Sequence, residues 1–336
     1  MSIKVGINGF GRIGRNILRI GLEREGIEFV GINDISNSKT LTHLFKYDSI
    51  FGPFKGDVKS EDGHMIINGK PIKVFSERNP ANIPWHEVGA ELIAEASGVF
   101  RSKEEVSAHL GETVKKVIIT APAKGEVDLT VVLGANEKEY DSAKHNIISN
   151  ASCTTNCFSM IVKVLHENFG IVKGQMTTVH SYTNDQQILD APHSDLRRAR
   201  AAAMSIIPTS TGAASAIKLI FPELDGKMSA VAMRVPTADV SVVDFTCEVK
   251  KSTTIEEVNE KYKQAAEGEL KGYLRYSDEE LVSSDFIGDP HSAIFDAPLT
   301  SVVQGNLVKV IGWYDNEYGY SSRVVDLIEY VGDRAK

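Results

Sequence analysis

The sequence predicts two domains of different class, an α/β domain built on a parallel sheet and an α+β domain with a mainly antiparallel sheet. In the first half, short apolar runs typical of buried strands alternate with helical patterns, which favours a parallel sheet. After Gly170, longer strand-like segments are separated by long loops, which favours antiparallel pairing. A length of 336 residues is typical of two domains.

The end of the chain makes the predicted domain boundary discontinuous. A final amphipathic helix is indicated by apolar residues at helical spacing, namely Val324, Leu327, Ile328 and Val331. We expect this helix to pack back on the first domain. The first domain is therefore predicted to comprise residues 1–152 with 316–336, and the second residues 153–315.

The first strand leads into a glycine motif. Ile3–Ile7 has the pattern of a buried strand and precedes GFGRIG, which runs from Gly9 through Gly11 to Gly14. A helical pattern follows, and a second strand then ends at Asp34, about 20 residues after the last glycine. Such glycines allow a tight turn and close approach of the backbone to a pyrophosphate, and the helix N-terminus receives its charge. The order of these parts predicts a Rossmann-type dinucleotide-binding domain.

Asp34 also bears on the choice of cofactor. A carboxylate at this strand end accepts hydrogen bonds from ribose hydroxyls and repels a 2′-phosphate. The sequence therefore favours NAD over NADP.

The remainder of the first domain continues the sheet. The segment 54–75 has the pattern of an antiparallel ribbon, with turn signals at Asp62-Gly63 and Asn68-Gly69. Further elements are expected as strands at 92–96, 116–120, 129–133 and 147–150, with a helix near 103–110. Thr120 ends a strand at the edge where a doubly wound sheet binds its ligand.

The last strand of this half leads to Cys153. Ser152 is a helix N-cap candidate, and the apolar residues after it have helical spacing, so Cys153 falls in the first helical turn. Unpaired N–H groups and the helix dipole favour an anion there, so we expect a thiol more acidic than a free one, whose pKa is about 8.5. The alternative is a small buried cysteine, and this segment alone does not decide. Cys157 and Cys247 are expected to be buried.

The second domain places a histidine and an arginine in strands. Strands are expected at 175–182, 228–235, 240–249 and 308–314, and a helix at 254–270. Side-chain alternation puts His180 on the same strand face as Thr178. His180 could take the proton of a nearby thiol, although a structural histidine is the commoner case. Arg234 lies in an apolar strand and needs a partner if it is buried; a bound phosphate would provide one.

A long loop at 184–208 carries a basic cluster, Arg197, Arg198 and Arg200. Solvated surface is the default for such a cluster, and the alternative is contact with a phosphate or a neighbouring subunit. Thr209–Gly212 supplies hydroxyls and a flexible backbone of the kind that holds anions. No metal-ligand set is predicted.

Composition excludes several classes of function. Lys and Arg number 37 against 45 Asp and Glu, and this net charge of −8 argues against a nucleic-acid or membrane surface. No apolar run is long enough to cross a bilayer, and the chain starts directly with a strand-like segment. Three cysteines fit a reduced, cytoplasmic setting better than a disulfide framework.

Several motifs together resemble those of phosphorylating glyceraldehyde-3-phosphate dehydrogenases, and the resemblance spans nearly the whole chain. The motifs are INGFGRIGR from Ile7 to Arg15, SCTTNC from Ser152 to Cys157, HSYTN from His180 to Asn184, TSTG from Thr209 to Gly212, and WYDNEYG from Trp313 to Gly319. The resemblance implies a glycolytic, cytoplasmic homotetramer. Its expected reaction oxidises D-glyceraldehyde 3-phosphate with NAD and inorganic phosphate, yielding 1,3-bisphosphoglycerate.

The resemblance also implies roles for individual residues. Cys153 corresponds to the nucleophile that forms a thiohemiacetal and then a thioester, and His180 to the base. Cofactor contacts are implied for Gly9, Gly11, Arg12, Ile13, Gly14, Asp34, Arg78, Thr120 and Asn316. Substrate and phosphate contacts are implied for Ser152, Thr154, Thr183, Arg198, Thr211, Gly212 and Arg234.

Four alternatives accompany this interpretation. NADP-using photosynthetic members have a residue like Ala191, whereas Pro192 and Ile35 resemble the NAD-specific form, so we predict NAD preference and leave residual NADP use open. Erythrose-4-phosphate dehydrogenases share the thiol motif but differ around 182–184 and 209–212. A surface-binding role with secondary catalysis is disfavoured by the intact Cys153 and His180, and a hydrolase needs no dinucleotide fold.

Overall fold

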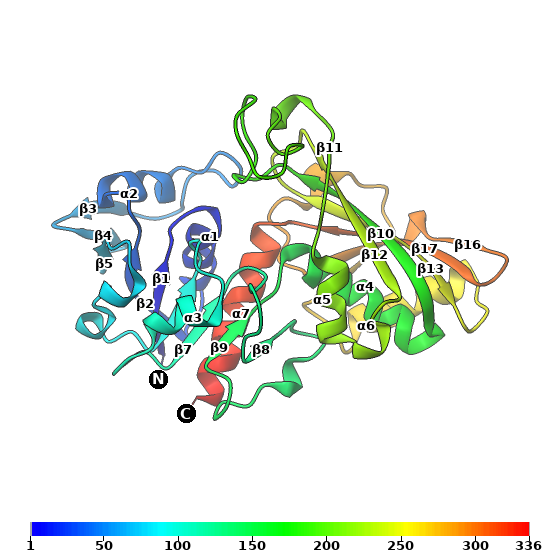
Figure 1. The fold of residues 1–336 in the computed structure, drawn as a ribbon, viewed down its shortest axis with the longest axis horizontal. Helices are drawn as coiled ribbons and strands as arrows, with labels where there is room; N and C mark the ends of the chain where they lie inside the picture. Colours follow the sequence, from blue (N-terminus) through cyan, green and yellow to red (C-terminus); the bar gives the residue numbers. More distant parts are fainter. Residues whose placement is uncertain (1, 336) are drawn as a thin grey trace. The chain divides into compact units, whose positions relative to one another are not determined.

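The computed structural model describes residues 2–335 and divides into two compact units. The first unit comprises the residues up to Val131, Lys138–Ala151 and the residues from Ser321 onward. The second comprises Val132–Glu137 and Ser152–Tyr320. Figure 1 shows the course of the chain through both units.

The first unit is built on a nine-stranded sheet with strand order β3-β4-β5-β2-β1-β6-β7-β9-β8. Its strands are β1 (Ile3–Asn8), β2 (Ile27–Asn33), β3 (Val58–Glu61), β4 (His64–Ile67), β5 (Lys70–Phe75), β6 (Leu92–Glu95), β7 (Lys116–Ile119), β8 (Leu129–Thr130) and β9 (Ile147–Ser149). From β5 to β8 all neighbours are parallel, and β3, β4 and β5 form the antiparallel ribbon expected at 54–75. Val5 and Ile7 of the central strand β1 are fully buried, as a parallel sheet covered on both faces requires.

Helices connect the parallel strands of this unit. They are α1 (Arg12–Gly21), α2 (Ser38–Lys46), α3 (Lys103–Val106) and the 3₁₀ helices η1 (Pro80–Asn82), η2 (Trp85–Val88) and η3 (Ser107–His109). The helix expected near 103–110 is thus a short α-helix, started by a Ser102–Glu105 capping box, that tightens into a 3₁₀ turn. From Ser321, α7 (Tyr318–Arg334) belongs to this unit, where Arg24 pairs with Asp326 at 3.0 Å.

The second unit contains a mixed sheet with strand order β11-β12-β10-β13-β17-β15-β14, and β16 pairs with β17. The strands are β10 (Ile171–Ser181), β11 (Ile207–Thr209), β12 (Met228–Val235), β13 (Ser241–Val249), β14 (Leu274–Ser277), β15 (Ala293–Asp296), β16 (Ser301–Val303) and β17 (Leu307–Tyr314). Within this second sheet, only the pairs β10–β12 and β14–β15 are parallel among the described residues, and the other pairs are antiparallel. The predicted α+β domain with a mainly antiparallel sheet is confirmed.

Three helices pack with this sheet in Figure 1, namely α4 (Cys153–Phe169), α5 (Ala213–Ile220) and α6 (Ile255–Glu267). Short 3₁₀ helices are η4 (Glu137–Glu139), η5 (Ala202–Met204), η6 (Pro222–Leu224), η7 (Ser283–Phe286) and η8 (Ala297–Leu299). The hydroxyl of Tyr262 on α6 donates to the carbonyl of Ile161 on α4 at 2.7 Å, and its ring stacks on Phe295 of β15. These contacts fix α4, and therefore Cys153, relative to the sheet. The structure contains no helix in residues 2–335 that is long and apolar enough to span a membrane.

Candidate active site

Cys153 is the first residue of α4. Ala151, just before it, has a positive φ of 54°, a left-handed conformation that turns the chain sharply between β9 and the helix. The Ser152 hydroxyl then caps the helix by accepting from the N–H of Thr155 at 3.0 Å. The predicted N-cap and the placement of Cys153 in the first turn are both confirmed.

His180 faces the thiol. Its Nε2 lies 3.6 Å from the Cys153 Sγ, and its Nδ1 lies 2.7 Å from the carbonyl oxygen of Ser181. Nδ1 also lies 2.9 Å from Nη1 of Arg234, but this donor has the same Ser181 carbonyl as its acceptor at 3.0 Å. Because a carbonyl only accepts, we assign the ring proton to Nδ1, which leaves Nε2 as an acceptor aimed at the thiol. Burial and the charge of Arg234 lower the pKa of His180 to about 3. The imidazole is therefore neutral and able to accept the thiol proton.

The thiol itself differs from the expectation. Burial raises the pKa of Cys153, and this effect outweighs the lowering by the Arg234 charge and by the hydroxyl and N–H of Thr154. The predicted helix N-terminus is present, but desolvation of the sulfur exceeds its effect. The resting pair is a neutral thiol beside a neutral imidazole.

Arg234 lies beside His180 in the parallel pairing of β10 and β12. Its Nη1 donates to the Ser181 carbonyl at 3.0 Å, and this oxygen also accepts from His180. Burial lowers the pKa of Arg234, and its Nε is buried with no hydrogen-bond partner among the described residues. A guanidinium with an unused donor needs an anion, so this residue fits a bound phosphate.

Tyr314 also contacts the site, although the sequence analysis gave this residue no role of its own. Its hydroxyl lies 2.8 Å from the Thr154 hydroxyl and 2.9 Å from the Thr178 hydroxyl, and its ring packs edge-on to His180. The residue after Cys153 is thereby tied to the strand that carries His180. Its presence in the motif WYDNEYG was the available signal, but only the pairing of β13 with β17 brings that strand here.

A second group of predicted anion-binding residues lies at the loop before α5. Arg198 donates through Nε to the Thr209 hydroxyl at 2.9 Å and through Nη2 to the Ser210 carbonyl at 3.2 Å, and it pairs with Asp185. Thr211 and Gly212 immediately precede α5, whose first N–H groups are suited to an anion. The loop expected to be solvated therefore holds Arg198 in a folded hydrogen-bond network.

Two further predicted site residues of the second unit, Thr183 and Asn316, make hydrogen bonds of their own. The Thr183 N–H donates to the Gln186 side chain at 3.2 Å. The Asn316 amide oxygen accepts from the hydroxyls of Ser181 and Ser241, each at 2.8 Å. This fixes the amide orientation and leaves its nitrogen as the group available to donate.

The glycine motif of the first unit has the geometry of a dinucleotide site. Gly9 has a φ of 90°, and a Cβ placed on it would lie 2.4 Å from the backbone of Ser97. A Cβ on Gly14 would lie 2.2 Å from the Gly9 carbonyl oxygen, whereas the space at Gly11 is open. The outer two glycines thus serve the turn and the helix packing, and the open one allows a ligand to approach.

Asp34 follows β2 beside this turn. One carboxylate oxygen accepts from the N–H of Phe10 and the other from the N–H of Ser36, each at 2.9 Å. A carboxylate can accept further hydrogen bonds, so Asp34 can still receive ribose hydroxyls. The residues present therefore fit NAD.

The other predicted cofactor residues lie in the same unit. Arg12 begins α1 and pairs with Asp48. Ile13 is half-buried, Arg78 is exposed, and the buried Thr120 hydroxyl donates to the Glu95 carbonyl at 3.1 Å.

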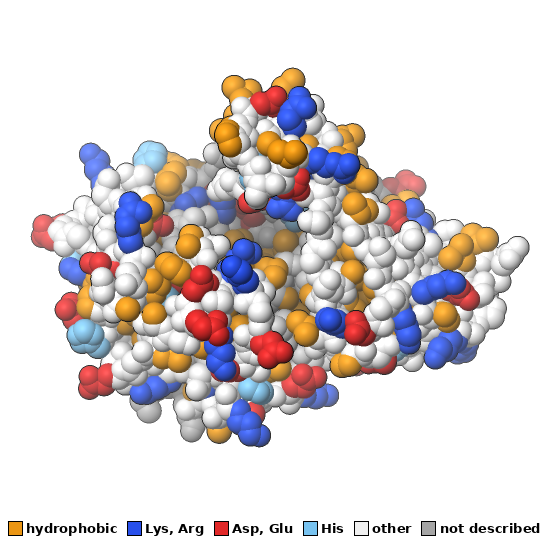
Figure 2. Space-filling view, in the orientation of Figure 1, with side chains coloured by type: hydrophobic (Ala, Val, Ile, Leu, Met, Phe, Trp, Pro, Cys, Tyr) orange, Lys and Arg blue, Asp and Glu red, His pale blue; other side chains and the backbone are white. Residues whose placement is uncertain are grey.

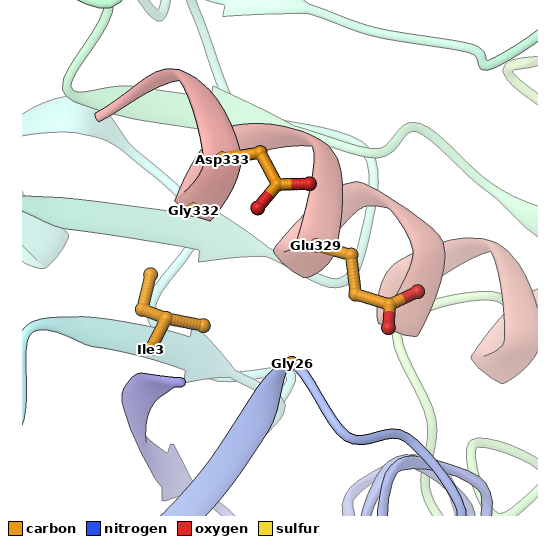
Figure 3. A pocket seen from close by; sticks show the side chains of 5 residues that line it. All are labelled: Ile3, Gly26, Glu329, Gly332 and Asp333. Atoms are coloured by element: carbon orange, nitrogen blue, oxygen red, sulfur yellow. The ribbon is translucent and has the colours of Figure 1, made fainter. Parts of the chain in front are cut away.

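A hollow on the first unit lies apart from these residues. Figure 3 shows its lining, which consists of Ile3, Gly26, Glu329, Gly332 and Asp333. Two carboxylates there would repel a phosphate or a nucleotide. None of the described residues forms a cluster of His, Cys, Asp and Glu suited to a metal ion.

Comparison with known proteins agrees with both halves of the chain. A family model described as "Glyceraldehyde 3-phosphate dehydrogenase, NAD binding domain" matches residues 3–103, and one described as the C-terminal domain matches residues 152–316. "Glyceraldehyde-3-phosphate dehydrogenase 1" of Bacillus cereus is 57% identical over 328 residues, which cover 98% of each chain. The chain belongs to the glyceraldehyde-3-phosphate dehydrogenase family.

Other family members are similarly close. "Glyceraldehyde-3-phosphate dehydrogenase" of Geobacillus stearothermophilus is 56% identical over 334 residues, 99% of each chain. "Glyceraldehyde-3-phosphate dehydrogenase 2" of a Nostoc species is 57% identical over 335 residues, again 99% of each chain. The predicted family, the fold class and the cofactor NAD are confirmed.

Proposed function

We propose that this protein oxidises D-glyceraldehyde 3-phosphate and phosphorylates it to 1,3-bisphosphoglycerate, with Cys153 as the nucleophile. The observation that carries the proposal is the 3.6 Å approach of the Cys153 Sγ to an unprotonated His180 Nε2. A thiol without a proton acceptor would remain a weak nucleophile at neutral pH. Family membership supports the same chemistry.

His180 moves the proton at each stage. Sγ attacks the aldehyde carbon while its proton passes to Nε2, and the protonated ring then donates to the oxygen of the thiohemiacetal. The neutral ring later takes the hydroxyl proton back as the carbon loses a hydride, which NAD accepts when bound. Inorganic phosphate attacks the resulting thioester, the C–S bond breaks, and the Cys153 thiolate is released for reprotonation.

Two anion sites are proposed around these residues. Arg234 and Thr183 hold the phosphate of the substrate, and the support is the buried Nε of Arg234 that has no partner among the described residues. The attacking phosphate is held by Ser152, Thr154, Thr211 and Gly212, with Arg198 nearby. The support is that two helix starts, those of α4 and α5, supply these residues.

We propose that NAD is bound by residues of the glycine turn and of the strand ends. They are Gly9, Gly11, Arg12, Ile13, Gly14, Asp34, Arg78, Thr120 and Asn316. We propose residues 1–152 with 316–336 as the NAD-binding domain and residues 153–315 as the catalytic domain. NAD is preferred to NADP because the Asp34 carboxylate repels a 2′-phosphate.

We also propose a cytoplasmic homotetramer. Its support is a set of strongly exposed large apolar side chains in the long loop, namely Ile188, Leu189, Leu196, Met204 and Ile206. Figure 2 shows hydrophobic side chains exposed on the segment that leads to β11, among charged ones. Exposure of this extent marks a surface that another subunit covers.

The decisive experiment traps the covalent intermediate. Protein, NAD and D-glyceraldehyde 3-phosphate are mixed without phosphate, and the modified residue is located by mass spectrometry. We expect the added acyl mass on Cys153, removed on addition of inorganic phosphate. An unmodified Cys153 with measurable turnover would overturn the proposal, and the same experiment with erythrose 4-phosphate tests the sister activity.

A further inference from the structure

A chain of buried polar side chains runs across the first unit at the carboxyl ends of three neighbouring strands. Asn33, Asn8 and Glu95 are the last residues of β2, β1 and β6, and the strand register places them side by side. All three are buried. Asn33 Nδ2 donates to Asn8 Oδ1 at 2.8 Å, and Asn8 Nδ2 donates to Glu95 Oε2 at 2.5 Å.

Glu95 is the centre of this chain because its carboxylate accepts four hydrogen bonds. Oε2 also accepts from His109 Nε2 at 2.9 Å, and Oε1 accepts from the N–H of Ser97 at 2.9 Å and from its hydroxyl. Trp85 Nε1 donates to His109 Nδ1 at 3.1 Å, which assigns the single ring proton to Nε2. A carboxyl group with four donors is an ionised acceptor.

This carboxylate is buried without a permanent cation. No Lys or Arg side chain of the described residues pairs with Glu95, and its partner His109 carries one ring proton in this arrangement. A buried charge is costly unless hydrogen bonds replace its water, and an apolar residue would stabilise the sheet at lower cost. The arrangement therefore favours a role beyond stability.

The segments of this unit that carry the proposed NAD contacts are connected to the Asn33–Asn8–Glu95 network by neighbouring positions in the sequence or by hydrogen bonds. Asn8 precedes Gly9, and the Gly9 N–H donates to the Asn33 carbonyl at 2.8 Å. Asn33 precedes Asp34, and its side chain makes two hydrogen bonds with the backbone of Glu77, which precedes Arg78.

The same residue, Glu95, reaches two further parts of the site. Its carbonyl accepts from both the N–H and the hydroxyl of Thr120, at 3.0 and 3.1 Å. Its carboxylate holds the turn at Ser97, against which Gly9 packs so closely that a Cβ would clash. Displacing Glu95 would therefore shift the glycine turn relative to the strand ends.

We propose that Glu95 is a positioning residue of the NAD site. It sets the glycine turn, Asp34, Arg78 and Thr120 in register through the four hydrogen bonds that its carboxylate accepts and the two that its carbonyl accepts. The proposal rests on the proposed function of these residues as cofactor contacts. Glu95 itself touches neither substrate nor cofactor in this role. It acts by fixing the backbone from which the contacts are made.

Glu95→Gln is the direct test because it preserves size and removes one acceptor. The amide nitrogen would face either the two Ser97 donors or those of Asn8 and His109, so either orientation places donor against donor. We expect the Kd and KM for NAD to rise about tenfold. We expect kcat at saturating NAD to change by less than about twofold, because the second unit is untouched.

Glu91→Gln is the matched control. Glu91 lies just before the other end of the same strand, β6. It is exposed, and it accepts a hydrogen bond from the Lys4 N–H at 3.0 Å. It should leave NAD affinity unchanged. Ser97→Ala removes the hydroxyl that donates to Glu95 and that accepts from the Val99 N–H at 3.1 Å, and it keeps the other three donors to the carboxylate. It is a milder second variant in case Glu95→Gln does not fold, and it should raise the Kd for NAD about threefold.

A lower Tm in Glu95→Gln with an unchanged Kd for NAD would overturn the proposal, since a merely structural residue behaves that way. An unchanged Kd in Ser97→Ala, where Glu95→Gln is unfolded, would do the same. Failure of the proposed function would look different, because the unsubstituted protein would then show no NAD-dependent turnover. The measurements are isothermal titration with NAD, steady-state kinetics and thermal unfolding of the full chain.

Discussion

Cys153 and His180 face each other as neutral groups, since burial raises the pKa of the thiol and lowers that of the imidazole. A preformed thiolate–imidazolium pair would be desolvated in the same place, and this arrangement avoids that cost. The proton therefore moves as the carbon–sulfur bond forms. Arg234 supports the transfer by holding the Ser181 carbonyl that orients the ring.

Replacing the sulfur should separate binding from chemistry. Cys153→Ser is expected to lower kcat by at least about a thousandfold while the Kd for NAD is unchanged, because a hydroxyl is far less nucleophilic than a thiol. Cys157→Ser is the control, since Cys157 is buried and its thiol donates to the Gly312 carbonyl at 3.7 Å. It should keep most of the turnover; substantial activity in Cys153→Ser would refute the assignment.

Removing the neighbouring charge should make the thiol less acidic. Arg234 lowers the pKa of Cys153, so Arg234→Gln is expected to move the midpoint pH of Cys153 alkylation by iodoacetamide upward. Arg197→Gln, an exposed loop residue, is the control and should not move it. A downward shift in Arg234→Gln would contradict this electrostatic account.

Sequence reasoning singled out Cys153 and His180, which the structure brings together, but did not predict their charge states. The motif around Cys153 predicted a helix start, and that is confirmed. The expected acidity of the thiol was wrong because burial, which depends on everything packed around the sulfur, exceeds the effect of one helix end. Tyr314 was missed as a contact for a similar reason, because it meets Thr154 from a strand far along the chain.

At the scale of elements, one buried carboxyl group lies in the β12–β13 turn, at Asp239, and another follows β17, at Asp315. Asp315 accepts from the N–H groups of Gly288, Glu317 and Tyr318, and so orders the turn that carries Asn316. Burial and the Asp315 charge raise the pKa of Asp239 to about 9, and burial also raises the pKa of Asp315. A protonated Asp239 can donate to Asp315.

This pair predicts a loss of stability with rising pH. The folded protein holds the Asp239 proton that the unfolded chain releases near pH 4, so the free energy of unfolding should fall between about pH 4 and about pH 9. Asp239→Asn should make this fall shallower and raise stability at pH 8 by at least about 1 kcal/mol.

Urea unfolding across that pH range measures the effect. Asp244→Asn is the control, because Asp244 is a partly exposed residue of β13 that pairs with Lys309. It should leave the pH dependence unchanged. An equal pH dependence in Asp239→Asn and the unsubstituted protein would contradict the assignment.

Element positions were predicted well where periodicity was long and less well where tertiary contacts decide. β12 spans Met228–Val235 as expected, because most of its residues are apolar. The strand expected at 129–133 is reduced to Leu129–Thr130, although Val131, Val132 and Leu133 are buried. Apolar character predicts burial in such a run, but a strand also needs a neighbouring strand with free backbone hydrogen-bonding groups to pair with.

At the scale of the whole molecule, the long loop at 184–208 carries several strongly exposed apolar side chains. Ile188 and Leu196 are 85% and 82% exposed, which is far above what a buried-core residue shows. The Arg198, Asp185 and Thr209 network keeps this loop folded while its apolar side chains face outward. Such a surface is costly in a monomer and stabilising between subunits.

Charge on this loop should weaken assembly. Leu196→Asp is expected to shift the protein from tetramer to smaller species at micromolar concentration, because a carboxylate would be desolvated at the contact. Val282→Asp, at a residue that is 60% exposed elsewhere in the second unit, is the control and should leave the mass unchanged. Light scattering with size exclusion measures both, and an unchanged tetramer in Leu196→Asp would exclude this loop from the interface.

The sequence by itself determined the class of each domain and the dinucleotide turn, and it indicated Cys153 as the proposed nucleophile, because these depend on local periodicity and on residue types at short spacing. Only the tertiary structure decided that His180 reaches Cys153, that Arg234 stands beside His180, and that Glu95 joins three strand ends. Those contacts depend on strand order and register across residues far apart in the chain. Side-chain pKa values depend on the same packing, since burial acts through every neighbour at once.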